Sequence, residues 1–181
     1  MNIRLLQLFM VALAIIAITS SYGISRESSK KYMWGKVISI QDGDTIVIED
    51  DNGKRRRVQL AYIDAPDMNP KTRTKQPLHD ESVKYLTGLL INKEIIIESF
   101  GVDKFSRIKG MVFLNKLNVN QEMVTRGFAE IYHPVRKNPR SYIKEYTDKF
   151  QEAEKFAKER KIGIWGDADY VSPYQFRRKN K

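Results

Sequence analysis

Residues 33–63 read MWGKVISIQDGDTIVIEDDNGKRRRVQLAYI, and this stretch decides the fold class. Short β-branched runs at 33–40 and 45–49 are typical of strands, and Asp50-Asp51-Asn52-Gly53 is a strong signal for a hairpin turn. The chain is predicted to return as a third strand over 54–63. Because side chains alternate across a strand, this third strand should place one set of residues on each face. One set is Val58, Leu60 and Tyr62, and the other is Arg57, Gln59, Ala61 and Ile63.

Beyond this stretch the sequence continues as a loop, helices and further strands. Asp64 to Pro77 contains three prolines and is predicted to be a loop. Apolar residues at helical spacing predict one helix around 83–90 and a longer one carrying a stripe from Ile143 to Ala157. The remaining predicted elements are strands over 94–100 and 108–114, a short helix over 118–126 ended by Gly127, and a closing turn over 163–166 around Trp165. Five short strands with interleaved helices are typical of a small closed barrel, so we expect an α+β fold: a five-stranded OB-type β-barrel with about three packed helices.

Composition narrows the possible functions. The chain has 181 residues, 32 Lys and Arg against 22 Asp and Glu, and a formal net charge of +10. Such a charge favours an anionic partner, either nucleic acid or a lipid surface. There is no cysteine, which excludes a disulfide scaffold, a thiolate metal site and a cysteine nucleophile. With only His79 and His133 present, any metal must be a hard cation held by oxygen ligands.

The first 23 residues have the three-part pattern of a secretory signal peptide. Arg4 gives a basic start, Leu8 to Ile18 is an unbroken apolar run, and small polar residues follow up to Gly23. Crossing a bilayer takes about 20 apolar residues, which this run does not reach. Export is therefore the favoured interpretation, with secretion or attachment to the cell envelope as the expected location and an uncleaved anchor as the alternative. The expected organisation is a signal peptide over 1–23, a linker over 24–33, one domain over 34–166 and a basic C-terminal tail over 167–181.

Three short stretches carry residues suited to chemistry. They are Asp42-Gly43-Asp44-Thr45, Ile63-Asp64-Ala65-Pro66-Asp67 and Asp103-Lys104-Phe105-Ser106-Arg107. Each has an ordinary structural explanation on its own, as a turn, a cap or a solvated loop. The first does not fit an EF-hand, which spreads its ligands over about 12 residues. Each stretch alone is weak evidence for a functional site, but the three together, in this order and on these predicted elements, are strong evidence for one.

In these motifs the sequence resembles the staphylococcal nuclease (thermonuclease) family of calcium-dependent phosphodiesterases. The resemblance extends from about Trp34 to Gly166 and includes Val119-Asn120, Gly127-Phe128-Ala129 and Ile164-Trp165. It implies an OB-type barrel, bound Ca²⁺ and a nucleic-acid substrate, DNA or RNA. The metal-site residues that it implies are Asp42, Asp44, Asp64 and the backbone carbonyl of Ala65. It also implies that Arg107 is one of two arginines that hold the scissile phosphate.

Two positions depart from the family pattern. Asp67 stands where the family has its catalytic glutamate, and Gln59 stands where it has its second phosphate-binding arginine. Gln59 can donate a neutral hydrogen bond but brings no charge, which by analogy costs on the order of 10²–10³ in rate. Asp67 is one methylene shorter than glutamate. Arg57, two residues from Gln59 on the same strand face, could fill the gap or could instead belong to a solvated, phosphate-tracking patch.

Two functions follow from these residues. The first is an exported calcium-dependent nuclease with reduced activity, in which Arg107, Asp67 and Gln59 form the catalytic set and Lys104 and Arg57 bind substrate. The second is a catalytically silent module that binds nucleic acid or an envelope partner. Contact with a membrane is expected only if the N-terminal segment is retained, and a monomer is expected.

Overall fold

The computed structural model describes residues 31–180 of the chain. The predicted signal peptide and residues 24–30 of the predicted linker lie outside the described residues. The first strand begins at Lys31, earlier than the predicted start of the domain at residue 34. Within residues 31–180, no helix combines the length and the apolar character needed to cross a bilayer.

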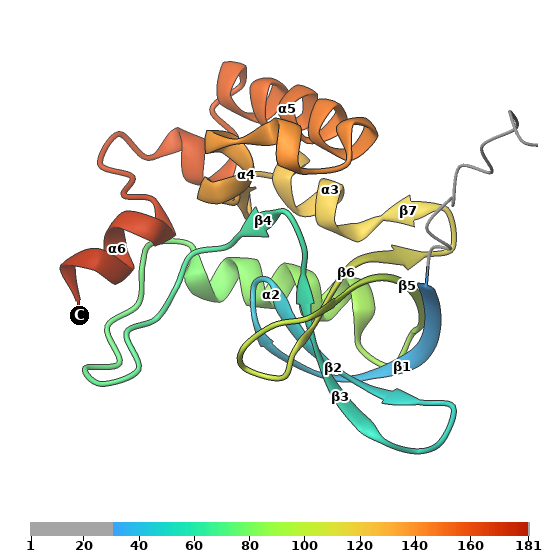
Figure 1. Cartoon of the computed structure of the whole chain (residues 1–181). Coiled ribbons are helices and arrows are strands. Elements are labelled where there is room, and N and C mark those ends of the chain that lie inside the picture. The colour runs from blue at the N-terminus through green and yellow to red at the C-terminus, as the bar shows by residue number, and fades with distance from the viewer. Residues whose placement is uncertain (1–30, 181) are drawn as a thin grey trace, which may run out of the picture.

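Five strands form the closed barrel that the sequence predicts (Figure 1). They are β1 (Lys31–Asp42), β2 (Thr45–Asp50), β3 (Arg55–Leu60), β5 (Glu94–Val102) and β6 (Ile108–Leu114). Neighbours pair antiparallel in the order β3-β2-β1-β5-β6, and parallel pairing of Val58 with Ile108 joins β3 to β6 and closes the barrel. Fully buried aliphatic residues fill it, among them Val37, Ile46, Ile48, Val58, Leu60, Ile97 and Val112.

The predicted third strand is wrong beyond Leu60. Ala61 and Tyr62 form a turn, and Tyr62 has a positive φ of 72°. The chain then makes a separate two-residue strand, β4 (Ile63–Asp64), which pairs antiparallel with β8 (Glu130–Ile131). Ala61, Tyr62 and Ile63 are all buried, so the alternation of faces ends at this turn. Because of this turn, the candidate site residue Asp64 lies on β4 and is not part of the barrel wall.

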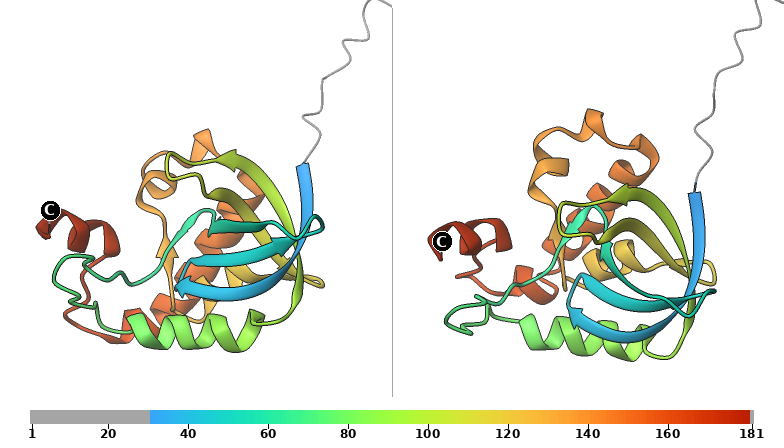
Figure 2. Two further views of the ribbon diagram at one scale, coloured as in Figure 1. Left: turned by 90° about the horizontal axis from the view of Figure 1, so that it is seen from below. Right: turned by 60° about the horizontal axis from the view of Figure 1, so that its bottom comes forward.

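Three helices pack against the barrel as expected: α2 (His79–Leu90), α3 (Val119–Thr125) and α5 (Lys144–Glu159). Figure 2 shows α2, in green, lying against the blue strand β1. The predicted stripe of α5 is buried from Tyr146 to Ala157, whereas Ile143 lies at the N-cap and is exposed. The other elements are β7 (Leu117–Asn118), α4 (His133–Lys137), α6 (Pro173–Lys179) and the 3₁₀ turns η1 (Pro139–Ser141) and η2 (Gly163–Gly166).

Asn120 connects α3 to the turn that precedes the site. Its buried amide donates to the carbonyls of Ala61 and Gly110, at 2.8 and 3.0 Å, and accepts from the N–H of Val112 at 2.9 Å. A buried backbone group left without a partner costs about 1–3 kcal/mol. Asn120 therefore holds the Ala61–Tyr62 turn in place and, through it, the start of β4.

The segment predicted as a basic C-terminal tail contains the helix α6. Ser172 caps it by accepting from the N–H of Gln175, and Pro173 occupies its first turn. In both views of Figure 2 the red α6 lies beside the green loop that precedes α2. A hydrogen bond of 2.7 Å from the Gln76 side chain to the carbonyl of Val171 joins these two segments.

Candidate active site

A cleft of about 1110 Å³ opens beside the barrel and collects most of the residues that the sequence analysis singles out. Of the candidate residues, those that line it are Asp42, Asp44, Gln59, Asp64, Ala65, Asp67, Lys104 and Arg107. Arg57 is absent from its lining. The lining also includes the aromatic residues Tyr62, Phe100, Phe105, Tyr132 and Tyr142 and the cations Lys109, Arg140 and Arg177.

The acidic turn between β1 and β2 reaches the cleft because residue 43 is glycine. A Cβ added at Gly43 would lie 2.0 Å from the hydroxyl oxygen of Ser82 and 2.7 Å from the Cβ of Ala65. Any larger residue would therefore push the turn away from α2 and from the segment after β4. The close approach brings Asp44 to Ala65, whose N–H donates to the Asp44 carboxylate at 3.3 Å.

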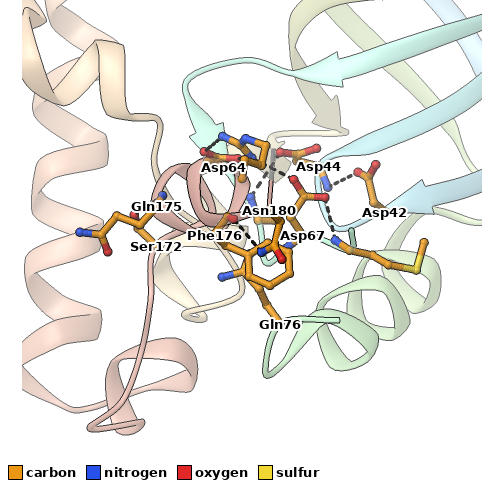
Figure 3. Close-up of polar contacts among 12 residues, drawn as sticks. Asp42, Asp44, Asp64, Asp67, Gln76, Ser172, Gln175, Phe176 and Asn180 are labelled. Atoms are coloured by element: carbon orange, nitrogen blue, oxygen red, sulfur yellow. Dashed lines mark hydrogen bonds and ion pairs between the residues drawn. The ribbon is translucent and has the colours of Figure 1, made fainter. Parts of the chain in front are cut away.

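Asp42 and Asp44 form an adjacent acidic pair, labelled in Figure 3. The Asp44 N–H donates to the Asp42 carboxylate at 3.1 Å. Burial raises the pKa of Asp44 well above its ordinary value, and the nearby charges of Asp42 and Asp64 raise it further. The carboxylates of Asp42, Asp44 and Asp64 repel one another, and a bound cation would offset this repulsion.

Asp64 is almost fully buried and is held by a residue from the far end of the chain. Arg177 of α6 donates to both of its carboxylate oxygens, at 2.6 and 2.9 Å, in a two-pronged ion pair. The same guanidinium donates to Asp67 at 3.1 Å. Burial raises the pKa of Asp64, while the guanidinium of Arg177 opposes that rise.

Asp67 is partly exposed and is fixed by the loop around it. Its N–H donates to the side chain of Gln76 at 2.7 Å, and its carboxylate accepts from the N–H of Met68 at 2.7 Å. Asp67 and Asp64 line the same cleft as the Asp42–Asp44 pair, and Figure 3 labels all four residues. The residue in the place of the family's glutamate thus lies beside the acidic cluster.

Arg107 is oriented by its own loop. Asp103 accepts from the Arg107 backbone N–H at 2.9 Å and from its guanidinium Nε at 2.8 Å. The far end of the guanidinium then faces the hydroxyl of Thr45, at 3.4 Å. This hydroxyl also lies 3.0 Å from the Gln59 side-chain oxygen, so Thr45 stands between the two candidate phosphate-binding residues.

Arg57 does not fill the place of the missing arginine. Its guanidinium donates to the backbone carbonyl of Phe105 at 2.6 Å and is directed at the loop that carries Arg107. Lys104 is exposed at the rim of the cleft, with its ammonium 5.0 Å from the centre of the Phe105 ring. Of the two cations predicted to bind substrate, the structure places only Lys104 at the cleft.

The donors in this cleft suit a hard cation such as Ca²⁺, because all of them are oxygen atoms. Among residues 31–180, however, no three acidic or histidine side chains converge closely enough to hold a metal by themselves. The expected meeting of Asp42, Asp44 and Asp64 is therefore incomplete, and both oxygens of Asp64 are engaged by Arg177. Calcium accepts backbone carbonyls and water as well as carboxylates. The Asp42–Asp44 pair, one oxygen of Asp64 and the carbonyl of Ala65 could together supply such a site.

Arg177 is the residue of the site that the sequence analysis misses. The pair Ser172-Pro173 is a helix-start signal that could have indicated α6. Nothing in that local signal shows which of the three neighbouring cations, Arg177, Arg178 or Lys179, points into the cleft.

The fold and the site define a class: OB-type α+β proteins whose cleft collects several aspartates and an arginine from the barrel. Residues 57–167 match the family model described as staphylococcal nuclease homologue. The chain belongs to the staphylococcal nuclease family.

Several named proteins are similar to it. One named uncharacterized endonuclease, from Haemophilus influenzae, is 32% identical over 146 residues, which cover 81% of this chain and 74% of that protein. The micrococcal nuclease of Shigella flexneri is 31% identical over 81% of this chain and 82% of its own. The thermonuclease of Staphylococcus hyicus is 27% identical, with the same coverage of 81% and 82%.

Proposed function

We propose that this protein is a calcium-dependent endonuclease that hydrolyses phosphodiester bonds of DNA or RNA, at a reduced rate. The endonuclease class rests on the family and on relatives named as nucleases. The observation that carries the proposal is that Asp42, Asp44, Asp64 and Arg107 all line one cleft. They come from three separate places in the chain, the β1–β2 turn, β4 and the loop 103–107, and a purely structural role would not require them to line the same cleft.

Each residue has a place in the hydrolysis of a phosphodiester. Arg107 would donate planar, charge-assisted hydrogen bonds to the phosphate oxygens, held in position by Asp103. Asp67 would accept a proton from the attacking water. The water oxygen then bonds to phosphorus, the bond from phosphorus to the leaving sugar oxygen breaks, and that oxygen takes a proton from solvent. A calcium ion bound at Asp42, Asp44, Asp64 and Ala65 would neutralise charge on the phosphate.

The reduced rate follows from the two departures from the family pattern. Gln59 brings no charge, and its oxygen lies 3.0 Å from the Thr45 hydroxyl. Asp67 carries a shorter side chain than glutamate, and its carboxylate already accepts from Met68 and Arg177. Both features weaken transition-state stabilisation without removing the fold or the acidic cluster.

Restoring the family residues should therefore raise activity. Gln59→Arg is expected to increase the calcium-dependent rate at least about tenfold, because it adds a charged donor beside Arg107. Asp67→Glu is expected to act in the same direction by at least about tenfold, since a 1 Å misplacement can cost about 10². The measurement is cleavage of single-stranded DNA at saturating calcium, with Lys116→Arg as a control away from the cleft. No gain in either variant, with DNA and calcium still bound, would contradict this explanation.

The experiment that tests the function itself compares cleavage of single-stranded DNA with calcium and with a chelator. Cleavage that the chelator abolishes and added calcium restores supports the proposal. Binding of DNA without cleavage under both conditions would favour the alternative, a silent module for nucleic acid or an envelope partner.

Export through the N-terminal segment is part of the same proposal. It rests on the apolar run Leu8 to Ile18 and the small residues that follow it. The expected result is a protein found outside the cytoplasm whose N-terminus, determined by sequencing, begins near residue 24. Full-length protein found only in the cytosol would contradict export.

A further inference from the structure

Of the residues predicted to be catalytic, only Arg107 brings a guanidinium to the cleft. Asp42, Asp44, Asp64 and Asp67 bring four carboxylates, and the substrate phosphate would add another negative charge. Arg107 already shares its charge with Asp103 at 2.8 Å. Gln59 is neutral, and Arg57 is directed at the carbonyl of Phe105. Attack on the phosphate therefore lacks a second guanidinium from the barrel.

Arg177 brings a guanidinium to this cleft from α6, outside the barrel. Its three hydrogen bonds, two to Asp64 and one to Asp67, put it between the expected metal ligand and the expected proton acceptor. A guanidinium is cationic throughout the physiological pH range, and Arg177 forms ion pairs with both Asp64 and Asp67. Arg107, Arg177 and Tyr132 all line the same cleft, so both guanidiniums border one space.

The helix that carries Arg177 is docked on the domain. Pro173 is buried, and the ring of Tyr174 stacks on His133 with 4.1 Å between the ring centres. Gln76, which also holds Asp67, donates to the carbonyl of Val171. The loop that positions Asp67 is thereby connected to the segment that positions Arg177. The matched family region ends at residue 167, before this helix begins.

The side chain of Arg177 retains freedom to change partners. It is 39% exposed, whereas its partner Asp64 is only 6% exposed. A cation taking one oxygen of Asp64 would leave part of the guanidinium fork without an acceptor. A phosphate arriving beside Asp64 and Asp67 would offer acceptor oxygens in the planar arrangement that a guanidinium recognises.

We propose that Arg177 is a catalytic residue that replaces the second phosphate-binding guanidinium, moved from β3 to α6. In the resting protein it neutralises Asp64 and Asp67, and with substrate bound it donates to the phosphate. The inference rests on the proposed nuclease function. Arg177 should stabilise the transition state less than an arginine at position 59 would, because it also remains paired with Asp67.

The test compares the full chain with Arg177→Gln, Arg177→Lys and, as a matched control on the same helix, Arg178→Gln. Arg178 lies over the ring of Tyr174 at 5.7 Å and is not part of the cleft lining. Arg177→Gln is expected to lower kcat on single-stranded DNA about 100-fold at saturating calcium, the size of a lost transition-state donor. The kcat of Arg177→Lys should lie between those of the starting protein and Arg177→Gln, because an ammonium keeps the charge but cannot donate two parallel hydrogen bonds as a guanidinium does. The kcat of Arg178→Gln should stay within about twofold of that of the starting protein, as expected for a side chain outside the cleft.

A second comparison uses position 59. Gln59→Arg should raise the rate about tenfold in the starting protein and at least about 100-fold in the Arg177→Gln background, because groups that serve one transition state are not additive. An equal effect in both backgrounds would overturn the proposal. So would an unchanged or increased kcat in Arg177→Gln, which would make Arg177 an inhibitory counterion of Asp64.

Binding measurements separate this inference from the function itself. With calcium present, Arg177→Gln should bind thymidine 5′-monophosphate about tenfold more weakly, while calcium affinity measured by calorimetry is equal or higher. Weaker calcium binding in that variant would overturn the proposal, because Arg177 would then act by positioning Asp64. If the starting protein binds calcium and nucleotide but never cleaves DNA, the proposed function fails, and nucleotide affinity still decides whether Arg177 contacts the phosphate.

Discussion

Arg107→Ala should reduce calcium-dependent cleavage to the background of the assay, a loss on the order of 10³–10⁵, the range that a transition-state arginine contributes in phosphoryl transfer. Arg107 is the guanidinium that the loop 103–107 presents to the cleft, with Asp103 holding its Nε and its backbone N–H. Its outer nitrogen faces Thr45 at 3.4 Å, beside the Asp42–Asp44 turn. Removing it takes away one of the two guanidiniums, Arg107 and Arg177, that we assign to the phosphate. The measurement is the single-turnover rate on single-stranded DNA.

Two further variants show whether the loss of cleavage is specific to the guanidinium of Arg107. Arg126→Ala removes a guanidinium that pairs with Glu122 on α3 and does not line the cleft, so its rate should be unchanged within about twofold. Arg107→Lys keeps a charge but not the planar fork, and it should remain severely impaired. An active Arg107→Ala protein would remove the catalytic assignment of this cleft.

Calcium affinity should fall at least about 100-fold in Asp44→Ala and in Asp64→Ala. Two unit charges about 4 Å apart interact by about 4 kcal/mol near a protein surface, and 100-fold corresponds to about 2.7 kcal/mol. Asp44 is the stronger test, because its carboxylate has no arginine partner among the described residues and its crowding with Asp42 and Asp64 favours a cation. Titration calorimetry on the metal-free proteins is the measurement.

The two aspartates should also differ in an informative way. Asp64→Ala releases Arg177 as well as removing a ligand, so its DNA affinity without metal should rise, whereas that of Asp44→Ala should rise less. Asp169→Ala, an exposed aspartate outside the cleft, should leave calcium affinity unchanged. Equal calcium affinity in all three variants would show that the metal binds elsewhere.

The barrel could be predicted from the sequence because its signals are local. The turn residues Asp50-Asp51-Asn52-Gly53 and the β-branched runs around them act within a few positions along the chain. The ends of α3 were predictable for the same reason, since Asn118 caps the first turn and Gly127 follows the last with a positive φ of 65°. The candidate residues Asp42, Asp44, Asp64 and Arg107 came from the resemblance of short motifs, and the cleft contains all four.

The sequence by itself determined the positions of the barrel strands up to Leu60, the three main helices, the family and the acidic motifs. The tertiary structure alone decided where the third strand ends, because the turn at Tyr62 depends on pairing with β8 and on the Asn120 amide, contacts from residues more than 50 positions away. It also decided that Arg57 points to the 103–107 loop and that Arg177 enters the cleft. Three adjacent cations in a C-terminal segment have equal helix propensity and equal charge. Only the docking of α6 on His133 and the Gln76 loop directs one of them at Asp64, because that orientation is set by packing across the fold.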